Sequence, residues 1–164
     1  MSISWTQELN TGIAVVDSQH KRIVDYINQL ETAVRQRDRA ATGGVLNELV
    51  DYTLSHFAFE ESLQEEAGYA HARPHKAVHD AIAKRVAKFQ ERHGTGEDIA
   101  EQLHGMLATW LVHHIKRDDQ AYVANVKARM ASIVQDKKDD SWLSRVLGRF
   151  FYRPCLMSVA VSDA

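Results

Sequence analysis

Cysteine is almost absent from this sequence, since Cys155 is the only one among 164 residues. A single thiol excludes an intramolecular disulfide and any metal site built from several cysteines, and it is compatible with a reducing cytosol. The first residues have neither the positive charge nor the apolar run of a secretory signal, and no apolar stretch is long enough to span a bilayer. These features predict a soluble, cytoplasmic protein.

An excess of charge of either sign is also missing. The chain has 20 basic and 22 acidic residues and a pI near 6.5, so no net electrostatic attraction draws it to nucleic acid or to an anionic membrane. We therefore expect no nucleic-acid partner. The length suits one folded domain, which we place at residues 1–136 with an N-terminal arm included. A polar link and an amphipathic tail follow over residues 137–164.

Proline is scarce as well, and only Pro74 and Pro154 interrupt the chain. Apolar residues recur at intervals of three and four, which is typical of helices with one buried face. Capping residues, a proline in a first turn and acidic residues at a positive helix end predict where four such helices begin. The four starts are near Asp17 and Ser18, near Thr42, Gly43 and Gly44, near Pro74, and at Glu97 and Asp98. Short connections favour an all-α, antiparallel up-down-up-down four-helix bundle.

Two segments lie outside the predicted bundle. Residues 1–16 are too apolar for a disordered leader, so we expect an arm that packs across the helices. After a polar link, apolar residues interleaved with arginines over residues 141–153 predict a C-terminal amphipathic helical extension. This extension could cover the bundle, bind a partner protein or rest on a membrane surface, and the sequence favours covering only as the simplest of the three.

Histidines and carboxylates recur at ligand spacings along these helices. The seven residues are His20, His56, Glu60, His75, His79, His114 and Asp119. His56 with Glu60, and His75 with His79, are four residues apart, so each pair leaves one face of a helix toward a single centre. Imidazole and carboxylate suit first-row transition metals, and they are costly to bury unpaired. The spacings therefore predict that these side chains enclose two metal ions inside the bundle.

His114 and Asp119 are five residues apart, and a regular helix would rotate the second side chain well away from the first. We therefore predict a local widening of the π-helical kind between them, a defect that gathers at functional sites. The other four histidines lack such an arrangement and are assigned no ligand role. These are His71, His93, His104 and His113.

In order, ligand type and interval, these motifs resemble the hemerythrin family, specifically its single-domain bacterial members, the bacteriohemerythrins. The resemblance covers roughly residues 5–125. The matching pieces are Trp5, Thr11 to Ile13, Asp17 to His20, His56 to Glu60, His75 to His79, Trp110 to Ile115, Asp119 and Tyr122.

The resemblance implies a non-haem di-iron centre that binds dioxygen reversibly, for oxygen storage, delivery or sensing. It assigns to one iron the ligands His75, His79 and His114. It assigns to the other iron, which keeps an open position, the ligands His20 and His56. Glu60, Asp119 and a solvent-derived oxo or hydroxo group would bridge the two irons.

The resemblance also implies an apolar wall that keeps water from the open position. The five residues of this oxygen pocket would be Ile23, Phe57, Trp110, Leu111 and Ile115, although core packing alone accounts equally well for each of them. Tyr122 is expected to hydrogen-bond near Asp119.

The chain is not expected to be an enzyme. Ferritin-like di-iron proteins present Glu-x-x-His pairs, and no glutamate stands three residues before His56, His75, His79 or His114. The alternatives are a di-iron enzyme, or a redox or oxygen-signalling module that acts through the C-terminal tail. Because such ligands also accept zinc or manganese, iron follows from the resemblance alone. The oxygen affinity, the recipient of the oxygen and the oligomeric state stay open.

Overall fold

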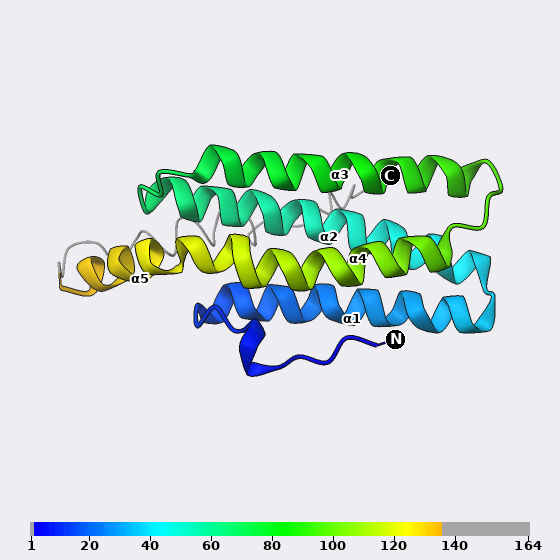
Figure 1. Cartoon of the computed structure of the whole chain (residues 1–164), viewed down its shortest axis with the longest axis horizontal. Coiled ribbons are helices and arrows are strands. Elements are labelled where there is room, and N and C mark those ends of the chain that lie inside the picture. Colours follow the sequence, from blue (N-terminus) through cyan, green and yellow to red (C-terminus); the bar gives the residue numbers. More distant parts are fainter. Residues whose placement is uncertain (1, 136–164) are drawn as a thin grey trace, which may run out of the picture.

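Four long helices dominate the computed structural model, which describes residues 2–135 (Figure 1). They are α1 (Ala14–Gln36), α2 (Arg39–Glu66), α3 (Ala72–Gly94) and α4 (Ala100–His114). Each helix runs antiparallel to the one before it, so the predicted up-down-up-down bundle is confirmed. The described residues contain no strand, and none of their helices is long and apolar enough to cross a membrane. The predicted link and tail, residues 137–164, lie outside the described residues.

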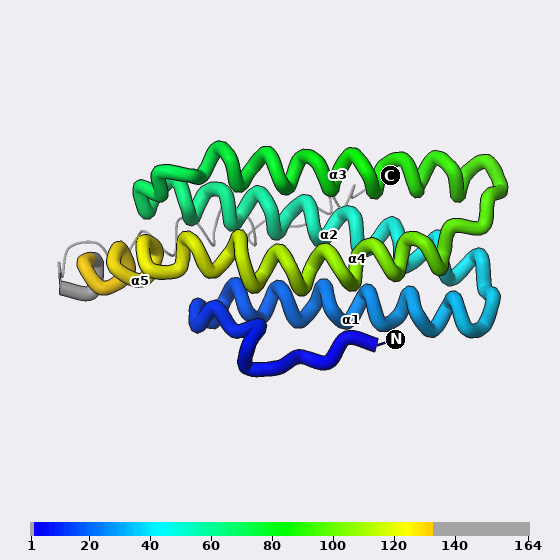
Figure 2. The backbone as a smooth tube through the Cα atoms, viewed as in Figure 1, coloured from blue at the N-terminus to red at the C-terminus, as the bar shows by residue number. Residues whose placement is uncertain are grey.

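The fourth helix does not end at His114. A π-helical turn, η2 (Ile115–Asp119), joins α4 to α5 (Gln120–Gln135), and Figure 2 shows all three on one continuous path. The predicted π-helical widening between His114 and Asp119 is therefore confirmed. It lets the chain continue in one direction while both side chains are buried.

Two helices begin earlier than the capping residues predicted. α1 begins at Ala14, because Asp17 serves the preceding loop and does not cap the helix. Its carboxylate accepts hydrogen bonds from the Thr11 amide at 2.7 Å, the Thr11 hydroxyl at 2.8 Å and the Gly12 amide at 3.0 Å. α2 begins at Arg39, after an Asp38 cap whose carboxylate accepts the amide of the third following residue at 2.9 Å.

The glycine pair that suggested a helix start lies inside α2. Gly43 has a packing role there, since a Cβ at this position would stand 2.8 Å from Nε2 of His93 on α3. α4 begins at Ala100, later than predicted, and Asp98 accepts a hydrogen bond from its amide at 3.4 Å. Pro74 occupies the first turn of α3 as predicted.

The N-terminal arm packs on the bundle as expected, although it is shorter than predicted and ends where α1 begins. Leu9, in a short 3₁₀ turn (Gln7–Leu9), is buried in the larger apolar cluster, and Trp5 packs against the same cluster. Glu8 pairs with Lys116 at 2.5 Å, and the Lys127 ammonium donates to the Thr11 carbonyl at 2.8 Å. These bonds fasten the arm beside η2 and α5.

Two apolar clusters form the core, and the seven buried histidines and carboxylates lie between them. Along α1, His20 stands between Val16 of the smaller cluster and Ile23 of the larger one. On the fourth helix, Asp119 stands between Ile115 of the larger cluster and Tyr122 of the smaller one. The polar centre therefore has an apolar cluster on each side of it along the bundle.

Candidate metal centre

All seven predicted ligands meet in the middle of the bundle, and none is more than 5% exposed. They come from every long helix: His20 from α1, His56 and Glu60 from α2, His75 and His79 from α3, His114 from α4 and Asp119 from η2. The potential ligand atoms form two groups within 4.8 Å. One group is Glu60, His75, His79 and His114, and the other is His20, His56 and Glu60.

The first group holds three imidazole nitrogens at close range. Nε2 of His79 lies 3.1 Å from Nε2 of His75 and 3.0 Å from Nε2 of His114. Glu60 Oε2 lies 3.3 Å from the His79 nitrogen. Lone pairs that converge in this way from separate helices are the arrangement that a cation requires.

Asp119 faces both groups. Its Oδ1 lies 3.1 Å from Nε2 of His114, whereas its Oδ2 lies 3.3 Å from Nε2 of His20. Both Asp119 oxygens and both His20 ring nitrogens are buried and have no hydrogen-bond partner among the described residues. Buried polar atoms rarely lack a hydrogen-bond partner, and coordination of a metal ion would provide these atoms with one. The donor set therefore fits a metal centre.

Three of the histidines also form hydrogen bonds through Nδ1, the ring nitrogen that faces away from the centre. Their partners are residues for which the sequence predicted no role. His79 Nδ1 donates to Glu61 Oε1 at 3.0 Å, and His114 Nδ1 donates to Asp118 Oδ2 at 3.1 Å. His56 Nδ1 donates to the Gln19 amide oxygen at 2.8 Å. Each bond fixes the ring and leaves Nε2 free to face the centre. The three supporting residues are Gln19, Glu61 and Asp118.

Of these three, only Asp118 could have been found from the sequence, because it follows His114 by four residues and so shares its helix face. Gln19 and Glu61 each support a histidine on a neighbouring helix, and nothing in the local sequence indicates that contact.

Tyr122 was predicted to hydrogen-bond near Asp119, and its partner is the second carboxylate of the centre, Glu60. The buried Tyr122 hydroxyl donates to Oε1 of Glu60. The π-helical turn carries α5 past Asp119, so this phenol reaches across to α2. Burial and the Glu60 carboxylate raise the pKa of Tyr122 well above its usual value, which keeps the phenol protonated as a donor.

Burial controls the electrostatics of the centre. It lowers the pKa of His20 and of His114 to about 4 and that of His56 to about 3, because the charged imidazolium is poorly solvated there. Burial likewise raises the pKa of Asp119 well above its usual value. Burial opposes ionisation of Glu60 too, but His56 and the other imidazoles hold its pKa well below the usual range. Neutral imidazoles are the form that binds a metal.

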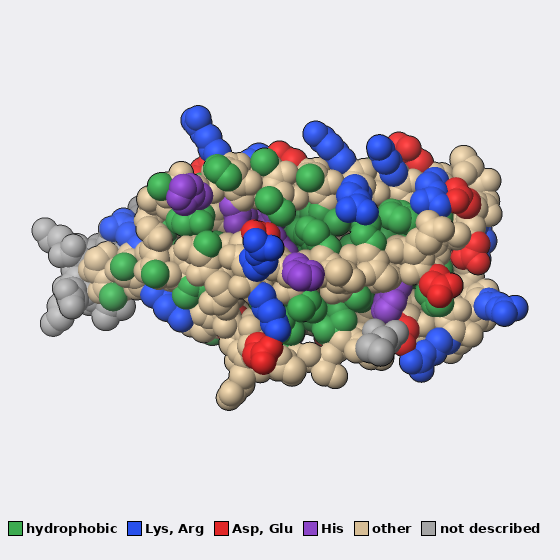
Figure 3. All heavy atoms as spheres, in the orientation of Figure 1, with side chains coloured by type: hydrophobic (Ala, Val, Ile, Leu, Met, Phe, Trp, Pro, Cys, Tyr) green, Lys and Arg blue, Asp and Glu red, His purple; other side chains and the backbone are tan. Residues whose placement is uncertain are grey.

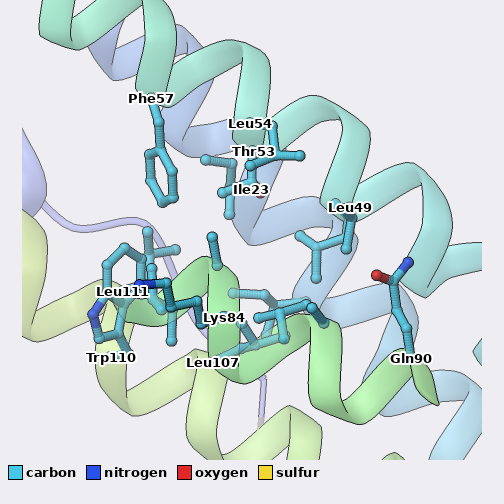
Figure 4. Close-up of a pocket in the computed structure, with 16 residues that line it drawn as sticks. Ile23, Leu49, Thr53, Leu54, Phe57, Lys84, Gln90, Leu107, Trp110 and Leu111 are labelled. Carbon is cyan, nitrogen blue, oxygen red and sulfur yellow. The ribbon is translucent and has the colours of Figure 1, made fainter. Parts of the chain in front are cut away.

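Aromatic rings cover the three-histidine group. Phe57 stacks on His79 with ring centroids 3.8 Å apart and planes 7° apart, and Trp110 stacks on His114 at 4.4 Å and 15°. Of the five predicted wall residues, four line an apolar pocket of about 340 Å³ beside the centre (Figure 4). These four are Ile23, Phe57, Trp110 and Leu111. Ile115 is fully buried in the larger apolar cluster and does not line this pocket.

The four histidines without an assigned ligand role belong to neither group. His71 and His113 are exposed, and His93 and His104 are half-buried.

Known proteins with the same features were found by sequence and by structure. A family model described as the hemerythrin HHE cation binding domain matches residues 11–126. A bacteriohemerythrin of Pseudomonas aeruginosa (strain LESB58) is 50% identical over 147 residues, which cover 90% of this chain and 96% of that protein. A bacteriohemerythrin of Methylococcus capsulatus (strain Bath) is 34% identical over 122 residues, covering 73% and 93%.

Solved structures agree with the sequence comparison. A crystal structure of wild-type hemerythrin superposes with a TM-score of 0.74 at 31% identity and covers 77% of this chain and 98% of that one. With a family model that spans most of the bundle, and a relative half identical along nearly the whole chain, this protein belongs to the hemerythrin family.

Proposed function

We propose that this protein binds dioxygen reversibly at a non-haem di-iron centre, for oxygen storage, delivery or sensing in the cytoplasm. One iron would be held by His75, His79 and His114. The other iron would be held by His20 and His56. Glu60 and Asp119 would bridge the pair, and the observation that carries this proposal is that the two oxygens of Asp119 face opposite histidine groups. When bound, two ferrous ions can each lend one electron to dioxygen and recover it on release.

The unequal division of the histidines supports binding of a small ligand. The group with His20 and His56 offers one protein ligand fewer than the group with three histidines, so an open position belongs on its side. A ligand can enter a metal site only where the coordination is incomplete. The hydrogen bonds behind His56, His79 and His114 hold these rings in place, so that a ligand can enter and leave without disturbing them.

Exclusion of water is the second requirement of reversible binding, because water and protons would promote irreversible oxidation of the irons. Phe57 and Trp110 lie flat against two of the imidazoles, and Ile23, Leu111 and Ile115 are buried. We propose that these five residues keep the centre dry while they also pack the core.

The ligand chemistry favours a binder over an enzyme. Di-iron carboxylate proteins of the ferritin-like kind use Glu-x-x-His pairs and a carboxylate-rich set, whereas five of the seven candidate ligands here are histidines. We therefore propose that the chain is not an enzyme, with residues 1–136 as the oxygen-binding domain. Residues 137–164, outside the described part of the chain, would then be dispensable for oxygen binding, and deletion of residues 140–164 tests this. Liposome binding by the full chain tests a membrane role for the tail.

A cycle of gas exchange tests the function. The iron-loaded protein is held under nitrogen, exposed to air and then evacuated, while its absorption spectrum is recorded. We expect a new spectrum that is stable in air and returns to the starting one on evacuation. Rapid one-way oxidation of the protein, with turnover of an added substrate, would instead indicate an enzyme.

A further inference from the structure

The apolar pocket beside the metal centre extends well beyond it. Its lining comes from all four long helices, and Figure 4 shows side chains of α2, α3 and α4 converging on one space. One end is formed by Phe57 and Trp110, which touch the histidines. The other end reaches Leu49 and Gln90, two turns away along α2 and at the far part of α3. The pocket is therefore an apolar cleft with the metal centre at one end.

The pocket is larger than a molecule of dioxygen requires. The pocket has a volume of about 340 Å³, whereas a small molecule such as water takes about 30 Å³ in the liquid. Pockets of roughly 300 to 1,000 Å³ are the usual size of sites for organic ligands in proteins. The space is thus suited to a molecule with a chain of carbon atoms.

Only three residues of the lining are polar, namely Thr53, Lys84 and Gln90. The Thr53 hydroxyl is buried and has no hydrogen-bond partner among the described residues. The Gln90 amide donates to Asn47 at 3.2 Å. Lys84 forms no salt bridge with any residue in the described part of the chain, and no carboxylate lines the pocket. An apolar space with one uncompensated cation is complementary to an anionic amphiphile.

Lys84 stands where the pocket meets solvent. The exposed members of the lining are Leu54 on α2 and Lys84 and Ala87 on α3, whereas Ile23 and Leu111 at the inner side are buried. Figure 3 shows apolar side chains exposed between α3 and α4, with several Lys or Arg side chains along α3. A ligand can therefore place its chain inside and keep its charge in water beside the ammonium group.

We propose that this pocket binds a medium-chain fatty acid, or an amphiphile of the same chemistry, with the acyl chain among the four helices and the carboxylate at Lys84. The ligand would contact Phe57 and Trp110, and these rings stack on His79 and His114. Binding of the ligand would therefore change the surroundings of the metal centre. This coupling rests on the proposed function, whereas the binding itself does not.

Calorimetric titration of the full-length, iron-loaded protein with decanoate tests the proposal, with decanol as the uncharged comparison. We expect saturable binding of one decanoate per chain. Lys84→Met should weaken decanoate binding about fivefold, the value of an exposed ion pair, and should leave decanol binding unchanged. Lys88→Met is the matched control, since Lys88 is exposed on the same helix and does not line the pocket. Ala83→Phe, which fills the pocket, should abolish binding of both ligands.

Absence of saturable decanoate binding overturns the proposal. So does an equal effect of Lys84→Met and Lys88→Met, or unchanged binding in a folded Ala83→Phe variant. Circular dichroism establishes that each variant is folded. A change in the iron absorption bands on decanoate addition is expected, and unchanged bands at saturation would refute the coupling while leaving the binding intact. Because calorimetry needs no oxygen, a failure of the proposed oxygen binding is detected separately by the gas-exchange cycle.

Discussion

The two histidine groups of the centre differ in the hydrogen-bond acceptors of their Nδ1 atoms. In the three-histidine group, His79 and His114 donate from Nδ1 to the carboxylates of Glu61 and Asp118. In the two-histidine group, His56 donates to the neutral amide of Gln19, and His20 Nδ1 has no partner among the described residues. A carboxylate acceptor makes an imidazole more basic and a stronger ligand than an amide does. We therefore expect the three-histidine group to hold a metal ion more strongly than the two-histidine group does.

Under the proposed function, this difference gives the two metal ions different roles. The ion held by three histidines would be mainly structural, and the ion held by two histidines would bind the incoming ligand. Phe57 and Trp110 stack on imidazoles of the three-histidine group, so these two rings cover the side that the carboxylates also support.

Loss of a ligand in the stronger group should have the largest effect. His79→Ala removes the nitrogen that lies within 3.1 Å of both other imidazoles of its group. We expect iron content to fall from two ions per chain to one or none, as measured by elemental analysis of protein purified with iron. His93→Ala is the control and should retain both ions. Retention of two ions by a double His56→Ala and Glu60→Ala variant would contradict the ligand assignment.

Removal of the supporting groups should weaken the two metal positions unequally. Glu61→Gln should lower metal affinity by roughly 10- to 100-fold, as such outer partners usually do, and Gln19→Ala should lower it less. Competition with a chelator measures both variants. Glu65→Gln, exposed on the same helix as Glu61, should behave like the wild type. Equal losses for the Glu61 and Gln19 variants would contradict the unequal support of the two metal positions.

A polar change in the wall should affect oxidation and leave the metals in place. Leu111→Ser should cost about 3 kcal/mol of stability, as for truncation of a buried leucine, keep both irons and raise the autoxidation rate several-fold. The rate is followed by absorption after exposure to air. Val112→Ser, at a half-buried position on the same helix outside the pocket lining, is the matched control. An unchanged rate in the Leu111 variant would show that the wall does not control water access.

Acidification should destabilise the metal-free protein moderately. The folded-state pKa values of His20 and His114 are about 4 and that of His56 is about 3, below the ordinary 6.5. Between these values the unfolded chain binds more protons than the folded one, so the free energy of unfolding falls as the pH drops from 6.5 toward 4. The raised pKa of Asp119 acts in the opposite direction and offsets part of this loss. Urea unfolding at several pH values measures the net slope, and a flat profile would contradict the burial argument.

Much of this fold and site could be predicted from the sequence, because ligand spacing and helix periodicity are local. The four-residue intervals in α2 and α3 predicted side chains that the structure brings together, and the five-residue interval between His114 and Asp119 predicted the π-helical turn. Helix starts were harder to predict. Asp17 has a good capping side chain, yet it binds the loop before α1, and Gly43 lies inside a helix because a neighbouring histidine packs against it.

Contacts between helices could not be predicted in the same way. The sequence did not indicate the partner of Tyr122, which is Glu60 on α2, and Glu61 meets His79 only because α2 and α3 pack side by side. Such pairs depend on how helices rotate against each other, and a periodic pattern in one helix does not contain that rotation. The supporting hydrogen bonds, and the inequality between the two groups, therefore emerge only from the structure.

Anomalous diffraction at the iron edge, from crystals of the iron-loaded protein, locates each bound iron ion. We expect two iron peaks per chain, one among His75, His79 and His114 and one beside His20 and His56, with Asp119 in contact with both. A single peak, a peak elsewhere, or an interior filled by side chains alone would contradict this assignment.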